Sequence, residues 1–151
     1  MPEIFEDAQL CKSIAFKELK TLAMKTKTTI TLIGVLNILQ GVGFIIGGRT
    51  LTEQSFPSDM LTPGAVEVGT AMHWPLGVAC IVIGIILFST RDLPLVNAKK
   101  VLLYTGIAYT FFLINGLTQH FTSPVNVPMP AVGLITVLAI LAFYTSKTAK
   151  S

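Results

Sequence analysis

Residues 28–48 read TTITLIGVLNILQGVGFIIGG and contain no Asp, Glu, Lys or Arg. A helix on the surface of a soluble protein needs a charged face toward water, and this segment has none. About 20 apolar residues of α-helix are enough to cross the hydrocarbon core of a bilayer, which is about 30 Å thick. Residues 28–48 are therefore predicted to form a transmembrane helix.

Two other stretches lack the same charged residues, namely residues 68–90 and residues 101–146. The second stretch is too long for one crossing. It contains TSPVNVPMP at residues 122–130, and a helix breaks there because proline lacks an amide donor and restricts the residue before it. The sequence therefore predicts four membrane spans, at about residues 28–48, 72–90, 100–120 and 130–145.

These spans predict an all-α fold in a single domain. An integral membrane four-helix bundle covers residues 28–146, and a cytoplasmic segment at residues 1–27 precedes it. The connection between the first two spans, at about residues 49–71, is polar and contains Pro57 and Pro63. We expect it to be a long loop that covers the outer end of the bundle.

The distribution of charge predicts the sidedness of the bundle. The chain of 151 residues has a formal net charge of +3, yet only 13% of its residues are charged, against about 25% in a soluble domain. Ten of the eleven basic residues lie before the first span, between the second and third, or after the fourth, and the exception is Arg49. Because cytoplasmic segments are enriched in Lys and Arg, both termini are expected on the cytoplasmic side of the cell membrane. No nucleic-acid partner is expected, because the basic residues flank spans and do not form a recognition helix.

Residues 3–23 have the pattern of an amphipathic helix. Apolar residues such as Phe16 and Leu19 share one face, whereas Lys20 falls elsewhere. We expect this helix to lie in the interface of the inner leaflet, where anionic headgroups attract its lysines. In the alternative, Met24 is the physiological start and the preceding residues are a poorly ordered extension. A cleaved signal peptide is disfavoured, because the apolar run begins late and lacks a small-residue cleavage site.

Glycines recur in the first two spans, where they allow another helix backbone to approach closely. Those expected to pack helices together are Gly34, Gly41, Gly43, Gly47, Gly77 and Gly84. Two of them, Gly43 and Gly47, form a GxxxG motif, and each of the first two spans contains a pair seven residues apart. We expect these glycine faces to pack against other membrane chains or a second copy of this one.

Polar side chains inside a span need a partner or a water-filled cavity. The candidates for ligand binding are His73, Trp74, Asn115, Gln119, His120, Asn37 and Gln40. Most are predicted to lie toward the outer side, where Arg49 or Glu67 from the first loop would help to form a pocket for a quinone headgroup or another small amphiphile. In the alternative interpretation, the amides tie helices together and the aromatic side chains anchor the span ends at the membrane interface.

Other kinds of site have little support in the sequence. No His or Cys residues have the spacing of a metal site, so no metal is expected. No Ser or Thr lies in a nucleophile motif, so no catalytic residue is assigned. The interiors of the spans contain no Asp, Glu, Lys or Arg, which argues against ion-coupled transport. Cys11 and Cys80 are predicted in different compartments, and a disulfide between them is not expected.

Residues 75–92 read PLGVACIVIGIILFSTRD. This glycine-containing helix, with its Arg-Asp exit, resembles the middle of the DoxX-like small membrane proteins. The resemblance covers residues 28–145 and implies four helices with a longer first outer loop. The namesake of that group resembles a subunit of a membrane thiosulfate:quinone oxidoreductase. No motif in this chain carries that activity over, so the resemblance implies the fold alone.

The patterns favour a non-catalytic membrane accessory protein or subunit that packs through its glycine faces, with a lipid or quinone as a candidate ligand. A small oxidoreductase subunit, or an enzyme that modifies a lipid or quinone at the outer polar side chains, is the alternative from a different class. A permease for a small neutral solute is a third hypothesis. Whether the protein is an enzyme stays open, with a non-catalytic role favoured.

Overall fold

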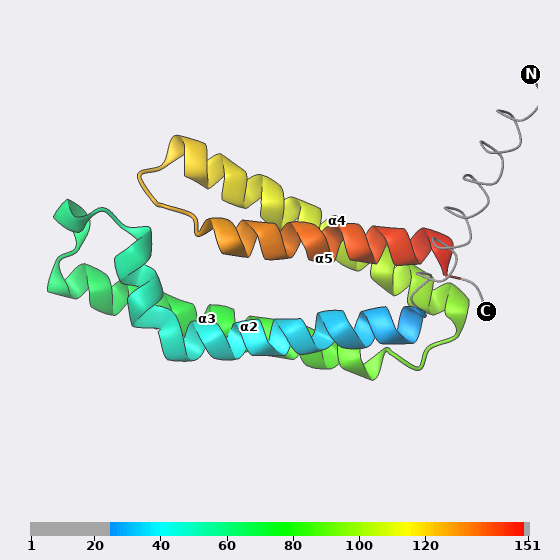
Figure 1. Ribbon diagram of the computed structural model, residues 1–151. Coiled ribbons are helices and arrows are strands. Elements are labelled where there is room, and N and C mark those ends of the chain that lie inside the picture. The colour runs from blue at the N-terminus through cyan, green and yellow to red at the C-terminus, as the bar shows by residue number, and fades with distance from the viewer. Residues whose placement is uncertain (1–24, 150–151) are drawn as a thin grey trace, which may run out of the picture.

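The computed structural model describes residues 25–149, which form four long helices joined by short connections (Figure 1). In chain order the elements are α2 (Thr26–Ser55), the short 3₁₀ helix η1 (Ser58–Met60), α3 (Pro63–Ser89), α4 (Leu95–Thr122) and α5 (Met129–Thr148). This part of the chain contains no β-strand. The amphipathic helix predicted at residues 3–23 lies outside the described residues.

All four helices are long and apolar enough to cross a membrane, which confirms the predicted number of candidate spans. Their outer surfaces remain apolar: Ile46 on α2 and Phe121 on α4 are 81% and 80% exposed. Large apolar surfaces of this kind are unfavourable in water but suit a lipid environment. The all-α class is therefore confirmed for residues 25–149, whereas insertion into a membrane and the side on which the termini lie stay predictions.

The predicted break between the third and fourth spans is confirmed. Helix α4 ends at Thr122 and α5 begins at Met129. Pro128 immediately precedes α5, and Pro130 lies in its first turn. A missing amide costs little at these positions, because the first amides of a helix have no partner within the helix.

The predicted loop at residues 49–71 is wrong in length. Both helices continue past the predicted spans, and only residues 56–62 connect α2 to α3. Arg49 ends the uncharged stretch, but the helix continues past it. Arg49 forms an i, i+4 ion pair with Glu53 on the helix surface. Charged residues therefore mark the end of the apolar segment and not the end of the helix. With its 30 residues, α2 is about 45 Å long, longer than the hydrocarbon core.

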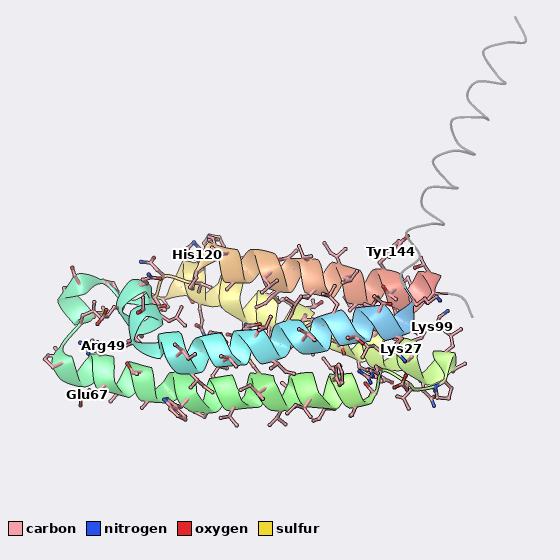
Figure 2. The ribbon with its side chains drawn as sticks, turned by 60° about the horizontal axis from the view of Figure 1, so that its bottom comes forward. Lys27, Arg49, Glu67, Lys99, His120 and Tyr144 are labelled. Carbon is pink, nitrogen blue, oxygen red and sulfur yellow. The ribbon has the colours of Figure 1, made fainter. Side chains whose placement is uncertain are left out.

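The helices form two antiparallel hairpins, α2 with α3 and α4 with α5 (Figure 1). The first and last described residues lie at the same end of the bundle (Figure 1). We call this end the basic end, because Lys27 and Lys99 lie there, and we call the opposite end, with Arg49 and Glu67, the pocket end (Figure 2). The four helices thus bring both described ends of the chain to one side.

Glycines bring the backbones of α2 and α3 into direct contact. A Cβ built on Gly41 would lie 2.5 Å from the carbonyl oxygen of Gly77, and one on Gly77 would lie 2.7 Å from that of Gly41. Gly34 and Gly84 have the same relation, at 3.0 and 2.6 Å. Because the partners repeat every seven residues on both helices, the contact stays on one face, as in a coiled coil.

Gly43 and Gly47 lie away from this contact. A Cβ on Gly43 would meet nothing within 4 Å among the described residues, and one on Gly47 would meet only Leu51 of its own helix, at 3.8 Å. The GxxxG motif therefore does not hold α2 against α3. Its role in packing against another chain stays a prediction.

The two hairpins pack against each other in the half of the bundle nearer the basic end. The buried side chains of this core are Ile30, Ile33, Leu87, Ala98, Leu102, Tyr109, Leu138, Ala139 and Ala142. No residue of α4 after Tyr109 is buried, and none of α5 before Leu138. The pocket end of the second hairpin thus contributes no buried side chain.

Candidate ligand-binding site

A pocket of about 980 Å³ opens at the pocket end, between the ends of α2 and α3 and below their connection. Its lining residues are Arg49, Glu53, Leu61, Pro63, Val66, Glu67, Thr70, Ala71 and Trp74. The α3 members recur every three or four residues and therefore share one face of that helix. Arg49 and Glu53 lie one turn apart on α2 and form the opposite wall. Figure 2 shows Arg49 and Glu67 at this end of the molecule.

The pocket is amphiphilic and slightly acidic. Arg49 Nε donates a hydrogen bond to Glu53 Oε1 at 3.0 Å, and both side chains remain exposed. Such an exposed pair contributes little to stability, so its groups are available to a ligand. Glu67 has no ion-pair partner among residues 25–149. With one arginine and two glutamates in its lining, the pocket has a formal charge of −1.

Trp74 contributes the aromatic surface of the pocket and is 57% exposed. It lies seven residues after Glu67, on the same face of α3. Tryptophan is enriched at the depth of the lipid headgroups. The structure therefore brings together three residues from the predicted outer pocket, namely Arg49, Glu67 and Trp74.

His73 does not line the pocket and turns toward α2 instead. Its Nδ1 lies 2.7 Å from the Gly69 carbonyl oxygen and 3.4 Å from Thr52 Oγ1. Because a carbonyl oxygen can only accept, Nδ1 carries the proton in this arrangement. The ring packs beside Phe44, with centroids 5.9 Å apart. His73 thus serves the contact between α2 and α3.

The polar residues of α4 are separate from this pocket. Gln119 Nε2 donates to Asn115 Oδ1 at 3.0 Å, and both side chains are exposed. His120 packs edge-on against Phe121, with centroids 5.3 Å apart, and its buried Nδ1 has no hydrogen-bond partner in the described part of the chain. None of these three polar residues lines the pocket that contains Trp74.

Asn37 and Gln40 lie deeper along α2. Asn37 is buried and donates hydrogen bonds to the Ile33 carbonyl at 2.8 Å and to the Tyr109 hydroxyl of α4. It joins the two hairpins, as the alternative interpretation of the sequence expected. Gln40 is half-buried and makes no hydrogen bond through its side chain within residues 25–149. The seven predicted site residues therefore occupy several places and do not form one site.

Several contacts in the structure were not predicted from the sequence. Glu53 and Thr70 line the pocket, and their helical spacing from Arg49 and Glu67 would have indicated this had the helices been extended. Thr29 and Thr145 approach within 3.1 Å in the core, and no local pattern indicates such a pair. They connect α2 to α5.

The described residues contain no group of three or more His, Cys, Asp or Glu side chains that could hold a metal ion. Cys80 on α3 is a free, half-buried thiol, and Cys11 lies outside the described residues. The polar groups that line the pocket are thus a guanidinium, two carboxylates, a threonine hydroxyl and an indole. Such groups can bind and orient a charged headgroup.

No protein-family model matches the chain, and no curated protein or solved structure is significantly similar to it. The resemblance of residues 75–92 to the DoxX-like proteins gains no support from these comparisons, and it stays a prediction. Any conclusion about function therefore depends on the geometry of the chain itself.

Proposed function

We propose that this chain is a non-catalytic multi-pass membrane protein that binds the headgroup of an amphiphilic molecule in the pocket between α2 and α3. The observation that carries the proposal is the pocket of about 980 Å³, with charged residues and Trp74 in its lining. Binding pockets for small molecules have volumes of about 300 to 1,000 Å³ and combine apolar walls with a few polar groups.

The position of the pocket supports a ligand drawn from the bilayer. Arg49 is the first charged residue after the apolar segment of α2, so it belongs at the depth of the headgroups. Trp74 opens the apolar segment of α3 and belongs at the same depth. A ligand whose headgroup lies here can leave its apolar part in the lipid.

The contacts of the other polar residues support a binding role over a catalytic one. His73 is hydrogen-bonded to a backbone carbonyl, and Asn37 joins two helices. The glycine pairs of α2 and α3 are occupied within the chain. We propose that association with another membrane chain or a second copy therefore uses other faces.

We further propose that the basic end lies in the cytoplasm and the pocket end outside the cell. The placement of Lys27 and Lys99 at one end, opposite Arg49 (Figure 2), supports this orientation. In a chain without native cysteines, Asp59→Cys should react with a membrane-impermeant maleimide in intact cells, whereas Asn97→Cys should react only after permeabilisation. The reverse labelling would overturn the orientation.

The binding function is tested by filling the pocket. The full chain and its Ala71→Phe variant are purified in mild detergent, and co-purifying lipids and quinones are identified by mass spectrometry. We expect one amphiphile to be retained by the native chain and lost, at least about tenfold, from the variant. Asn115→Phe, on the exposed surface of α4, is the matched control. Equal retention by all three proteins would exclude this pocket as the site.

A further inference from the structure

The charges around the pocket select one class of headgroup, an inference that rests on the proposed function. We propose that the pocket binds a zwitterionic phospholipid with a primary ammonium group, of the phosphatidylethanolamine type. In this arrangement Arg49 holds the phosphate, while Glu67 and Trp74 hold the ammonium. Each half of the headgroup then meets a different helix.

The phosphate site is the guanidinium of Arg49 on α2. Only its Nε is occupied within residues 25–149, by the hydrogen bond of 3.0 Å to Glu53. The two Nη groups carry four further N–H donors, and the side chain is 77% exposed. A planar guanidinium with free Nη groups is well suited to phosphate oxygens. By accepting the hydrogen bond from Nε, Glu53 orients the guanidinium of Arg49.

The ammonium site lies on the facing wall, on α3. Glu67 is an exposed carboxylate without an ion-pair partner among the described residues. Trp74 lies two turns further along the same face. A carboxylate attracts an alkylammonium by charge and hydrogen bonds, and the face of an indole attracts it through its quadrupole. The two features together indicate a cationic group.

Other amphiphiles fit these charges less well. An anionic headgroup would face two glutamates and only one arginine. The carbonyls of a quinone can accept from Arg49, but a quinone has no N–H or O–H to donate to the Glu67 carboxylate. A quaternary ammonium has no N–H and would lose its hydrogen bonds to Glu67. A zwitterionic headgroup with a primary ammonium meets all three groups. Its ammonium contacts the carboxylate and the indole, and its phosphate contacts the guanidinium.

The size and apolar lining of the pocket agree with this ligand. Its volume of about 980 Å³ exceeds what a headgroup alone requires, and Leu61, Val66 and Ala71 line the remainder. Ala71 and Trp74 follow Glu67 along α3 toward its apolar segment, so in the proposed arrangement they offer a surface to the glycerol and the first methylenes of the acyl chains.

Trp74 also supplies the measurement, because it is the only tryptophan of the chain. Lipids brominated on the acyl chain close to the glycerol quench an adjacent indole. We would titrate the full chain in detergent micelles with brominated phosphatidylethanolamine, phosphatidylcholine and phosphatidylglycerol. The ethanolamine lipid should quench at a concentration about tenfold lower than the glycerol lipid, and more strongly than the choline lipid.

Variants assign the two halves of the site. Glu67→Gln should remove the preference for the ethanolamine lipid, by about tenfold, while Glu67→Asp retains it. Arg49→Gln should weaken the binding of the ethanolamine lipid and of the choline lipid to the same extent. Gln119→Glu changes an exposed side chain of α4 and should change nothing. Circular dichroism confirms that each variant keeps its helices.

The outcomes separate the two levels of the proposal. Saturable quenching by all three lipids at the same concentration would overturn the headgroup assignment and leave the binding function standing. A preference that survives Glu67→Gln would also overturn it. A third outcome is that neither a brominated lipid nor a brominated quinone quenches the fluorescence of Trp74 more than that of free indole in micelles. In that case the pocket does not bind amphiphiles, and both proposals are wrong.

Discussion

The contact between α2 and α3 differs in kind from the contact between the two hairpins. In the first, two glycine pairs, seven residues apart on each helix, bring backbone against backbone. In the second, the fully buried side chains lie in the half of the bundle nearer the basic end. Two polar pairs, Asn37 with Tyr109 and Thr29 with Thr145, join the hairpins there. A backbone contact leaves no room for adjustment, whereas a side-chain contact can repack.

The largest effect is expected from filling the backbone contact. Gly41→Leu should destabilise the bundle by about 3 kcal/mol or more, because even a Cβ would lie 2.5 Å from the Gly77 carbonyl oxygen and inserted atoms force backbones apart. The free energy of unfolding would be measured by SDS titration in mixed micelles. Gly43→Leu, two residues away with open space around it, is the control and should stay near the native value. Because leucine favours a helix more than glycine does, a loss at Gly43 as large as that at Gly41 would contradict the backbone contact as its cause.

A smaller effect is expected where the hairpins meet. Tyr109→Phe removes the hydroxyl that accepts a hydrogen bond from Asn37. Hydrogen bonds between membrane helices contribute on average about 0.6 kcal/mol and at most about 1.7 kcal/mol. We expect a loss in this range, because Asn37 keeps its bond to the Ile33 carbonyl. A double-mutant cycle with Asn37→Ala measures the coupling, and a coupling of zero would contradict the interaction.

The pair Thr29 and Thr145 separates the loss of a hydrogen bond between the hairpins from the cost of an unpaired buried hydroxyl. Thr29→Val alone should cost about 1 kcal/mol, because it leaves the buried Thr145 hydroxyl without its partner in α2. Replacing both residues by valine should restore most of the loss, since no orphaned hydroxyl remains and the shape is kept. Thermal unfolding of the three variants measures the pattern. The double variant could instead be less stable than both Thr29→Val and Thr145→Val. That result would show that the two hydroxyls stabilise the fold through contacts other than the one between them.

The smallest effect is expected at the basic end, where charges join α2 to the connection after α3. Hydrogen bonds from Lys27, at 2.6 Å, and Arg91, at 3.2 Å, lower the pKa of the Asp92 carboxyl below its ordinary value of 3.8. A lowered pKa stabilises the fold at pH values above the ordinary pKa, and this stabilisation is lost as the pH falls through the lowered value. Because the Asp92 side chain is exposed, the effect is small.

The measurement compares thermal unfolding of the native chain and Asp92→Asn between pH 6 and pH 2. The native chain should be slightly more stable at pH 6, and the difference should vanish at the acidic end. Salt should reduce the difference at pH 6, because exposed ion pairs are screened. A difference that grows as the pH falls would show that the carboxylate is unfavourable in the folded state.

Hydropathy and proline placement were enough to predict four candidate spans and the break at residues 122–130, because lipid tolerates few charges and helices tolerate few prolines. The same reasoning placed the end of the first helix too early. Arg49 ends the apolar segment, but nothing after it breaks a helix until Pro57, which follows α2. Length in the membrane and length of the helix are separate properties.

The polar candidates show what a single sequence leaves open. Trp74 was predicted to open its helix, but α3 begins at Pro63, so Trp74 lies near the middle of that helix, whereas Asn115 lies in the last third of α4. The direction in which a helix faces depends on its partners. The glycine pairs turn His73 toward α2 and leave Trp74 on the pocket face, while Asn115 lies on the other hairpin. The separation of Trp74 from Asn115 is set by how the helices pack, and a single sequence does not contain that information.

The glycine contact has a consequence for biosynthesis. It needs no residue beyond α3, so the first hairpin can close while the ribosome is still adding α4 and α5. Asn37 must then wait for Tyr109, 72 positions later in the chain, before its amide finds a partner on the second hairpin. Until that moment its bond to the preceding turn, at the Ile33 carbonyl, spares the amide from facing hydrocarbon unpaired. The order of translation therefore allows the α2–α3 contact to form before the contact between the hairpins.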